Sequence, residues 1–162
     1  MSRTPAGVNL GWALAVVLRR WHDSVEEVLS HLPQGTRGYH VLSTVVREDM
    51  PTQAALAAHL AIDRTVMTYL IDELEADGLV ERQPDPADRR ARRIVPTKRG
   101  RDFLATADRR VAAVEDAILT GLTPDERSAF HDLTHRAATR IHAEDPEADL
   151  CATVREVVEE TR

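Results

Sequence analysis

Arginine side chains concentrate between residues 85 and 93, where the sequence reads DPADRRARR. A guanidinium group is always charged and thin enough to enter a DNA minor groove, where the negative potential is enhanced. We therefore predict that Arg89, Arg90 and Arg92 bind DNA. Asp88 can pair with one of them and stiffen the loop tip, which gives it a structural role. The alternative is a solvated run of charges, the commoner meaning of such a segment standing alone.

The charge of the chain is unevenly distributed. The formal net charge is −6, which by itself disfavours binding to nucleic acid. However, residues 81–101 contain eight basic and three acidic residues, whereas residues 144–162 contain seven acidic and two basic residues. Charges farther apart than roughly 8 to 10 Å are screened at physiological salt. The local basic excess therefore allows phosphate contact, provided that the acidic end is kept away.

A helix is predicted just before the arginine-rich loop. Asp63 is a suitable N-cap and Gly78 is typical of a left-handed helix end, so we expect the helix to run to about Asp77. At about 100° per residue, one side of this helix faces the core. The residues on that side are Met67, Leu70, Ile71 and Leu74.

The opposite side of this helix is polar near its start. Hydroxyl groups can reach base edges or phosphates, methyl groups can contact thymine, and free amides at a helix start favour a phosphate. We predict that this side enters the major groove, although a solvated surface helix is the alternative. Asp72 lies halfway along and repels phosphate. The predicted contact residues are Arg64, Thr65, Val66, Thr68 and Tyr69.

Apolar periodicity predicts three helices before this one. They cover residues 9–31, 36–48 and 53–60, with Pro33 and Gly35 ending the first. The third helix, the turn after it and the helix capped by Asp63 would together form a helix-turn-helix. Short β-type runs at 79–82 and 92–95 flank the arginine-rich loop and predict a hairpin.

Two long helices are predicted after the hairpin, one starting at Thr97 and one running from Thr123 to about Ala143. Thr123, Pro124 and Glu126 form a helix-start signature, with a Glu three residues after the cap. We expect the second of these helices to bury Phe130, Leu133 and Ile141. A last acidic helix is predicted over residues 148–160.

Composition excludes several classes of protein. The 162 residues are 43% hydrophobic and 30% charged, which is typical of a folded chain. Only 4% are aromatic, which disfavours a base-stacking platform. No apolar run approaches the roughly 20 residues that span a bilayer, so no membrane partner is expected. The single Cys151 and the lack of a recognisable signal peptide favour the cytoplasm.

The sequence from residue 52 to residue 100 resembles the MarR family of bacterial transcriptional regulators. TQAALAAHLAIDRTVMTYLIDELEADGLVER is similar to the family's helix-turn-helix, and Asp88-x-Arg90-x-x-x-Ile94-x-x-Thr97-x-x-Gly100 resembles its wing signature. The resemblance extends over about residues 9–143. One departure is Pro96, which lacks a backbone donor and is expected to shorten the wing.

The resemblance implies a mainly α fold with a small β-wing, namely a winged helix-turn-helix with N- and C-terminal dimerisation helices. Residues 1–35 would form the N-terminal dimerisation helix, residues 36–100 the DNA-binding region, and residues 101–162 the C-terminal dimerisation helices with the acidic tail. The implied function is that of a ligand-responsive homodimeric repressor that binds a palindromic operator in double-stranded DNA. Arg90 would be the wing-tip residue in the minor groove. The apolar faces of the end helices independently favour a dimer, because one chain offers them no other burial.

Several further sites were considered. A small aromatic or anionic effector is expected from the resemblance, and Trp12, Trp21 and His40 could line its pocket, although the tryptophans could instead be dimer core. His131 and His135 have a spacing that could hold zinc, but no further ligand pattern accompanies them, so we expect no metal and no cofactor. The acids around Cys151 disfavour a reactive thiolate.

Two other functions compete with DNA-dependent regulation. A winged-helix module that binds proteins and not DNA is favoured mildly by the net charge of −6 and the acidic C-terminal segment. An enzyme is disfavoured, because the sequence has no paired carboxylates in context, no glycine loop that cradles phosphate and no nucleophile elbow.

Overall fold

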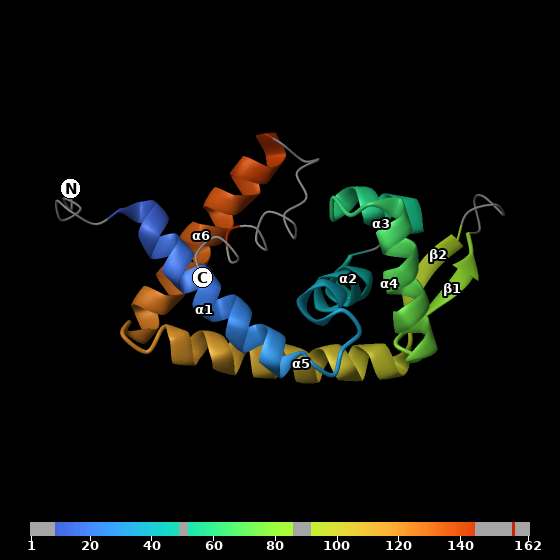
Figure 1. The fold of residues 1–162 in the computed structure, drawn as a ribbon, viewed down its shortest axis with the longest axis horizontal. Coiled ribbons are helices and arrows are strands. Elements are labelled where there is room, and N and C mark those ends of the chain that lie inside the picture. Colours follow the sequence, from blue (N-terminus) through green and yellow to red (C-terminus); the bar gives the residue numbers. More distant parts are fainter. Residues whose placement is uncertain (1–8, 49–51, 86–91, 145–156, 158–162) are drawn as a thin grey trace.

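The computed structural model describes residues 9–48, 52–85, 92–144 and 157. Figure 1 shows a long helix, α5, with two groups of elements along it. The winged-helix lobe, which consists of α2, α3, α4, β1 and β2, lies at one end. The helical scaffold, which consists of α1, α5 and α6, extends to the other. The elements are α1 (Leu10–Val28), α2 (Gly35–Arg47), α3 (Gln53–His59), α4 (Arg64–Ala76), β1 (Val80–Pro84), β2 (Arg92–Pro96), α5 (Lys98–Ile118) and α6 (Pro124–Glu144).

This arrangement confirms the mainly α fold with a small β-wing that the sequence predicts. The sheet consists of β1 and β2 paired antiparallel, with Arg82 opposite Ile94. Within the described ranges, no single helix is long and apolar enough to cross a membrane, and only the bent pair of α3 and α4 meets the length and composition criterion jointly.

The lobe has a dense apolar core of its own. The predicted inward residues of α4 are all 1% exposed or less, and residues from α2, α3, β1, β2 and the start of α5 pack around them. Burial of this kind stabilises a domain by roughly 25 cal/mol per Å² of apolar surface. The largest side chains in this core are Leu42, Leu56, Met67, Leu70, Ile71, Leu74 and Leu79.

The ends of α4 follow from its sequence. Gly78 has a φ of 68°, its amide donates to the Glu75 carbonyl at 2.9 Å, and the Leu79 amide donates to the Leu74 carbonyl at 2.9 Å. This is a Schellman motif, in which a glycine tolerates the left-handed conformation without strain. The chain thereby reverses directly from α4 into β1, as Gly78 predicts.

The first two helices differ from prediction at their junction. The predicted helix over 9–31 ends at Val28, three residues early, and Gly35 begins α2 instead of ending α1. Gln34 has a φ of 60° and Gly35 a φ of 53°, so the turn is left-handed here. Glu26 explains the early start of α2, because its Oε1 accepts a hydrogen bond of 3.0 Å from the Thr36 amide.

Pro96 does not shorten the wing, so that expectation was wrong. It forms the last pair of the hairpin, opposite Val80. The following residue, Thr97, donates from its amide to the Leu79 carbonyl at 3.1 Å. Because amides alternate in direction along a strand, the position of Pro96 requires no donor toward β1.

The scaffold is much less completely buried than the lobe. Its core contains Val25 of α1, Leu29 at the C-cap of α1, and Ala107 and Val111 of α5. The expectation that α6 buries Leu133 and Ile141 is not met within one chain, since they are 60% and 67% exposed. Phe130 is half-buried. The predicted capping box is confirmed, because Thr123 and Glu126 exchange hydrogen bonds.

Candidate nucleic-acid interface

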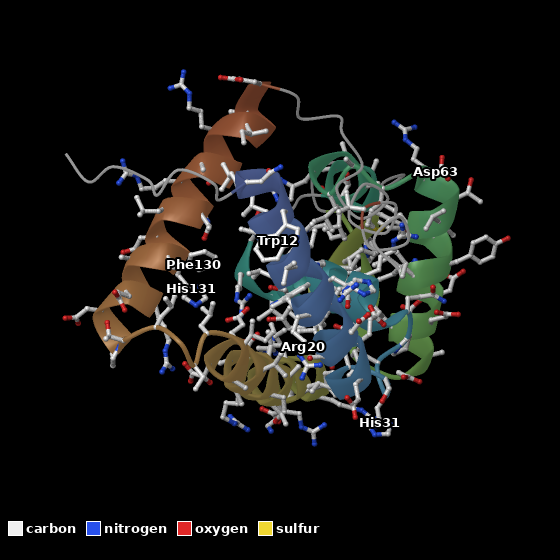
Figure 2. All side chains as sticks on the ribbon, turned by 60° about the vertical axis from the view of Figure 1, so that its left-hand side comes forward. Trp12, Arg20, His31, Asp63, Phe130 and His131 are labelled. Carbon is white, nitrogen blue, oxygen red and sulfur yellow. The ribbon has the colours of Figure 1, made fainter. Side chains whose placement is uncertain are left out.

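The start of α4 is held by its own cap. Asp63 Oδ1 accepts hydrogen bonds from the Thr65 amide at 2.7 Å and the Val66 amide at 3.3 Å. These two bonds, the first being the stronger effect, hold the pKa of Asp63 below its usual value, so the carboxylate stays charged. The amides expected to be free for a phosphate beside Arg64 are therefore already occupied. Figure 2 shows Asp63 at the outer end of α4.

The predicted contact residues of α4 fall into two groups. Thr65, Thr68 and Tyr69 are exposed, and Tyr69 is 66% exposed. Val66 is half-buried and packs against the lobe core, so it presents less surface than predicted. A face with two hydroxyl-bearing threonines and a projecting phenol can donate and accept hydrogen bonds at base edges.

The Thr68 hydroxyl is oriented by its neighbours. It donates to the Arg64 carbonyl at 2.9 Å and accepts from Gln53 Nε2 at 3.0 Å. Gln53 lies at the start of α3, so this bond fixes the two helices of the helix-turn-helix to each other. The sequence does not predict this role of Gln53, because nothing in its local pattern distinguishes it from other polar residues.

Arg82 forms ion pairs with two acids of α4. Its guanidinium lies 2.5 Å from Asp72 Oδ1 and 2.5 Å from Glu75 Oε2, and its amide donates to Glu75 Oε1 at 2.9 Å. Arg82 Nε also reaches Gln53 Oε1 at 3.4 Å. The repulsion between Asp72 and phosphate that the sequence indicates is thus reduced by a residue of β1.

Three of the predicted contact residues line one open groove of about 350 Å³. Arg64 and Thr68 reach it from α4, and Arg92 reaches it from the start of β2. Two guanidinium groups and the N-terminal end of α3 meet here, which is suitable for a phosphate backbone. The lining residues are Thr52, Gln53, Ala54, Ala57, Arg64, Met67, Thr68 and Arg92.

The predicted wing residues Asp88, Arg89 and Arg90 lie outside the described residues. The rest of the wing signature has a clear physical basis. The Thr97 hydroxyl donates to the Gly78 carbonyl at 2.7 Å and accepts from the Gly100 amide at 2.9 Å. A Cβ at Gly100 would lie 2.0 Å from the Leu79 carbonyl oxygen, so only glycine allows this approach. These contacts fasten α5 to the wing.

The residues predicted to line an effector pocket do not lie together. Trp21 Nε1 donates to Glu115 Oε1 at 3.1 Å, and Trp21 lines a cavity of about 170 Å³ between α1, α5 and α6. Trp12 lies on the surface near the start of α1 and is 66% exposed (Figure 2). His40 lies on α2 against the Tyr39 ring, with centroids 5.7 Å apart, and burial lowers the pKa of His40.

His131 and His135 of α6 were considered above as a possible zinc pair. Among the described residues, no group of three or more His, Cys, Asp or Glu side chains could hold a metal ion. His131 packs instead edge-on to Phe130, at a centroid distance of 6.4 Å. Cys151 and the predicted helix over 148–160 lie outside the described residues.

An exposed apolar surface covers the outer parts of the scaffold. Among the described residues, every exposed large hydrophobic side chain other than Tyr69 lies on α1 or α6. Large apolar side chains left in solvent in this number often mark an interaction site. We call it the scaffold face, and its members are Leu10, Trp12, Leu14, Val16, Leu133 and Ile141.

A helix-turn-helix followed by a β-hairpin, with a polar helix face and a basic groove on one side, defines the winged helix-turn-helix class. Residues 38–91 match the sequence profile of the MarR family. YybA of Bacillus subtilis strain 168, an uncharacterized HTH-type transcriptional regulator, is 26% identical over 126 residues, which cover 77% of this chain and 84% of that protein. The winged-helix region of the chain is thus similar to that of MarR-family proteins, as its sequence indicates.

Solved structures have the same architecture. A crystal structure of MarR has a TM-score of 0.75 and 25% identity, covering 91% of this chain and 100% of that one. CouR from Rhodococcus jostii RHA1, bound to p-coumaroyl-CoA, has a TM-score of 0.65 and 28% identity, covering 85% of this chain and 96% of that one. The fold is thus that of a MarR-family transcriptional regulator.

Proposed function

We propose that the protein is a homodimeric repressor that binds a palindromic operator in double-stranded DNA. The observation that carries this proposal is the exposed polar start of α4 beside a groove that contains Arg64 and Arg92. In the proposed complex, Thr65, Thr68 and Tyr69 contact base edges in the major groove, and Arg89 and Arg90 reach the minor groove beside it.

The same proposal assigns a role to each part of the chain. Residues 36–100 bind DNA, whereas residues 1–35 and 101–162 form the dimer. The scaffold face supports this division, because a second copy would bury its apolar side chains. A twofold pair of lobes matches the symmetry of a palindromic site.

We also propose that a small aromatic or anionic effector regulates the protein. CouR has p-coumaroyl-CoA bound, which supports a ligand of this chemistry. The cavity beside Trp21 is the candidate site, since it is lined by apolar side chains together with Glu115 and His131. A small neutral phenol that fits this cavity should release the protein from DNA, and Trp21→Ala should weaken that response more than it weakens DNA binding.

DNA binding can be tested by fluorescence anisotropy with duplexes selected from a random pool and with the DNA that flanks the gene. We expect a steep decrease in affinity with salt, because basic side chains displace counterions from phosphates. Arg64→Ala and Arg92→Ala should each weaken binding and reduce the salt slope by about 1, as loss of one phosphate contact does.

Arg109→Ala is the matched control. It removes the same charge from an exposed position on α5 that does not line the groove, and it should leave the salt slope unchanged. If the unmodified protein has no affinity for any duplex at low ionic strength, the proposal that it binds DNA is wrong. A winged-helix module that binds proteins is then the better hypothesis.

A further inference from the structure

The lobe and the scaffold meet at a polar junction around one carboxylate. Asp108, halfway along α5, accepts a hydrogen bond from the Tyr39 hydroxyl at 2.7 Å through Oδ1. Its second oxygen, Oδ2, accepts from Arg47 Nη2 at 2.6 Å. Arg47 also donates to the Ser43 hydroxyl, one turn earlier on α2. One side chain of the scaffold thus binds two residues of α2, one in its first half and one at its last position.

The position of these two donors restricts how α2 can lie on α5. Tyr39 and Arg47 are eight residues apart in sequence, which corresponds to about 12 Å along a helix axis. Their side chains converge on a single carboxylate, so a tilt or rotation of α2 breaks at least one of the two bonds. Tyr39 also packs against both the lobe core and the scaffold core, so it moves with neither one alone.

The Tyr39 hydroxyl is a permanent donor in this junction. Burial, and then the hydrogen bond to Asp108, raise the pKa of Tyr39 to about 12. The phenol therefore keeps its proton at any working pH. The Arg47 pair is more open to solvent, with side chains 53% and 33% exposed, so its contribution is weakened by screening.

The junction binds the lobe to the middle of α5. The lobe is also bound to the start of α5, where Thr97 and Gly100 contact Gly78 and Leu79 and Leu104 enters the lobe core. A single attachment would let the lobe rock about the end of α5. A second attachment at Asp108 fixes the angle between α5 and the lobe. This also fixes the direction of α4, because the inward side chains of α4 lie in the lobe core.

We propose that Asp108 is a positioning residue that sets the spacing between the two α4 helices of the dimer, and hence the half-site spacing that the protein accepts. This inference rests on the proposed dimeric DNA binding. A lobe held at a fixed angle can match one spacing without deforming the DNA, whereas a lobe that rocks can match several.

The test uses the full-length protein and a series of duplexes. The half-site selected by the unmodified protein is placed as an inverted repeat, and the spacer is changed by about one base pair at a time around the optimum. The measured quantity is the ratio of affinities for the optimal and the altered spacers. Asp108→Ala removes both bonds, and Asp108→Asn keeps an acceptor for Tyr39 while it loses the charge opposite Arg47.

Asp102→Ala serves as the matched control, since Asp102 is an exposed carboxylate on the same helix that pairs only with Lys98 in the described contacts. Tyr39→Phe removes a single bond of the junction. Circular dichroism and size-exclusion chromatography establish that each variant is folded and dimeric. Asp108→Asn is the variant that decides the test if Asp108→Ala does not fold.

We expect the spacer ratio to fall about tenfold in Asp108→Ala, which corresponds to about 1.4 kcal/mol, and less in Asp108→Asn and Tyr39→Phe. Affinity for the optimal spacer should decrease only a few-fold, since a loose lobe must be ordered on binding. If Asp108 only stabilises the fold, Asp108→Ala will lower the affinity for all spacers equally and leave the ratio of affinities unchanged. That result would overturn the positioning role of Asp108, but it would not contradict dimeric DNA binding. If the unmodified protein shows no spacer preference at all, the proposed palindromic recognition fails as well.

Discussion

The lobe and the scaffold bury their apolar residues in different ways. The lobe closes a core within one chain, where the inward side chains of α4 are almost completely buried. The scaffold has a small core and leaves tryptophan, leucine and isoleucine side chains in solvent. Both regions show amphipathic helices with similar periodicity in the sequence. The difference supports the proposed dimer, because the lobe core is complete within one chain and the exposed apolar side chains of the scaffold are left uncovered.

The largest expected effect concerns the core of the lobe. Ile71→Ala should lower the free energy of unfolding by about 2 to 5 kcal/mol, because it leaves a cavity in a close-packed interior. Urea denaturation at dilute protein concentration measures this change. Leu133→Ala is the comparison variant in the scaffold, since Leu133 is 60% exposed in the single chain. An equal loss of stability in dilute, monomeric Leu133→Ala would contradict the distinction between the two regions.

A smaller effect is expected at the scaffold face. Trp12→Ala should weaken the proposed dimer by about 2 to 4 kcal/mol, as truncation of an aromatic side chain that a partner desolvates does. Sedimentation equilibrium measures the dissociation constant. Tyr69 on α4 is a control with the same 66% exposure. Tyr69→Ala should leave the dimer intact and weaken DNA binding. Trp12→Ala should therefore have the larger effect on the dimer dissociation constant, and Tyr69→Ala the larger effect on the affinity for DNA.

The smallest effect is expected at the cap of α4. The pKa of Asp63 is lowered in the folded state, chiefly by its bond to the Thr65 amide. Its contribution to stability is therefore present above the unfolded pKa of an aspartate and is lost as pH falls through the lower folded pKa. Asp63→Ala should be less stable than the unmodified lobe at neutral pH, with a difference that shrinks in acid.

Asp63→Asn separates capping from titration. Asparagine is a good N-cap and carries no charge, so this variant should keep most of the stability and lose the pH-dependent part. Thermal unfolding followed over an acid pH series gives both quantities. A stability difference between the unmodified protein and Asp63→Ala that does not change with pH would show that the charge of Asp63 is not involved.

Local signals in the sequence predict the lobe well. Asp63 and Gly78 mark the ends of α4, because each satisfies backbone groups of its own helix. Thr123 and Glu126 mark the start of α6 for the same reason. The α1–α2 junction was less accurately predicted, since Glu26 acts on it from a different helix. Contacts between distant residues leave no trace in local periodicity.

The placement of the candidate site residues was predictable only where it depends on local sequence. The outward face of α4 follows from helical geometry, and Arg92 follows from the concentration of arginines. The roles of Arg82, Gln53 and Asp108 could not be inferred, because their partners lie on other elements. The exposure of Leu133 and Ile141 could not be inferred either, because periodicity shows that a helix face is apolar but not which chain covers it.

In the proposed complex, two copies of this chain present two lobes to one palindromic duplex. Sedimentation velocity of the full-length protein, alone and with a selected palindromic duplex, measures this stoichiometry. We expect a dimer in the absence of DNA and a complex of two chains with one duplex. A monomer alone, together with a duplex that sediments unchanged at low ionic strength, would contradict it.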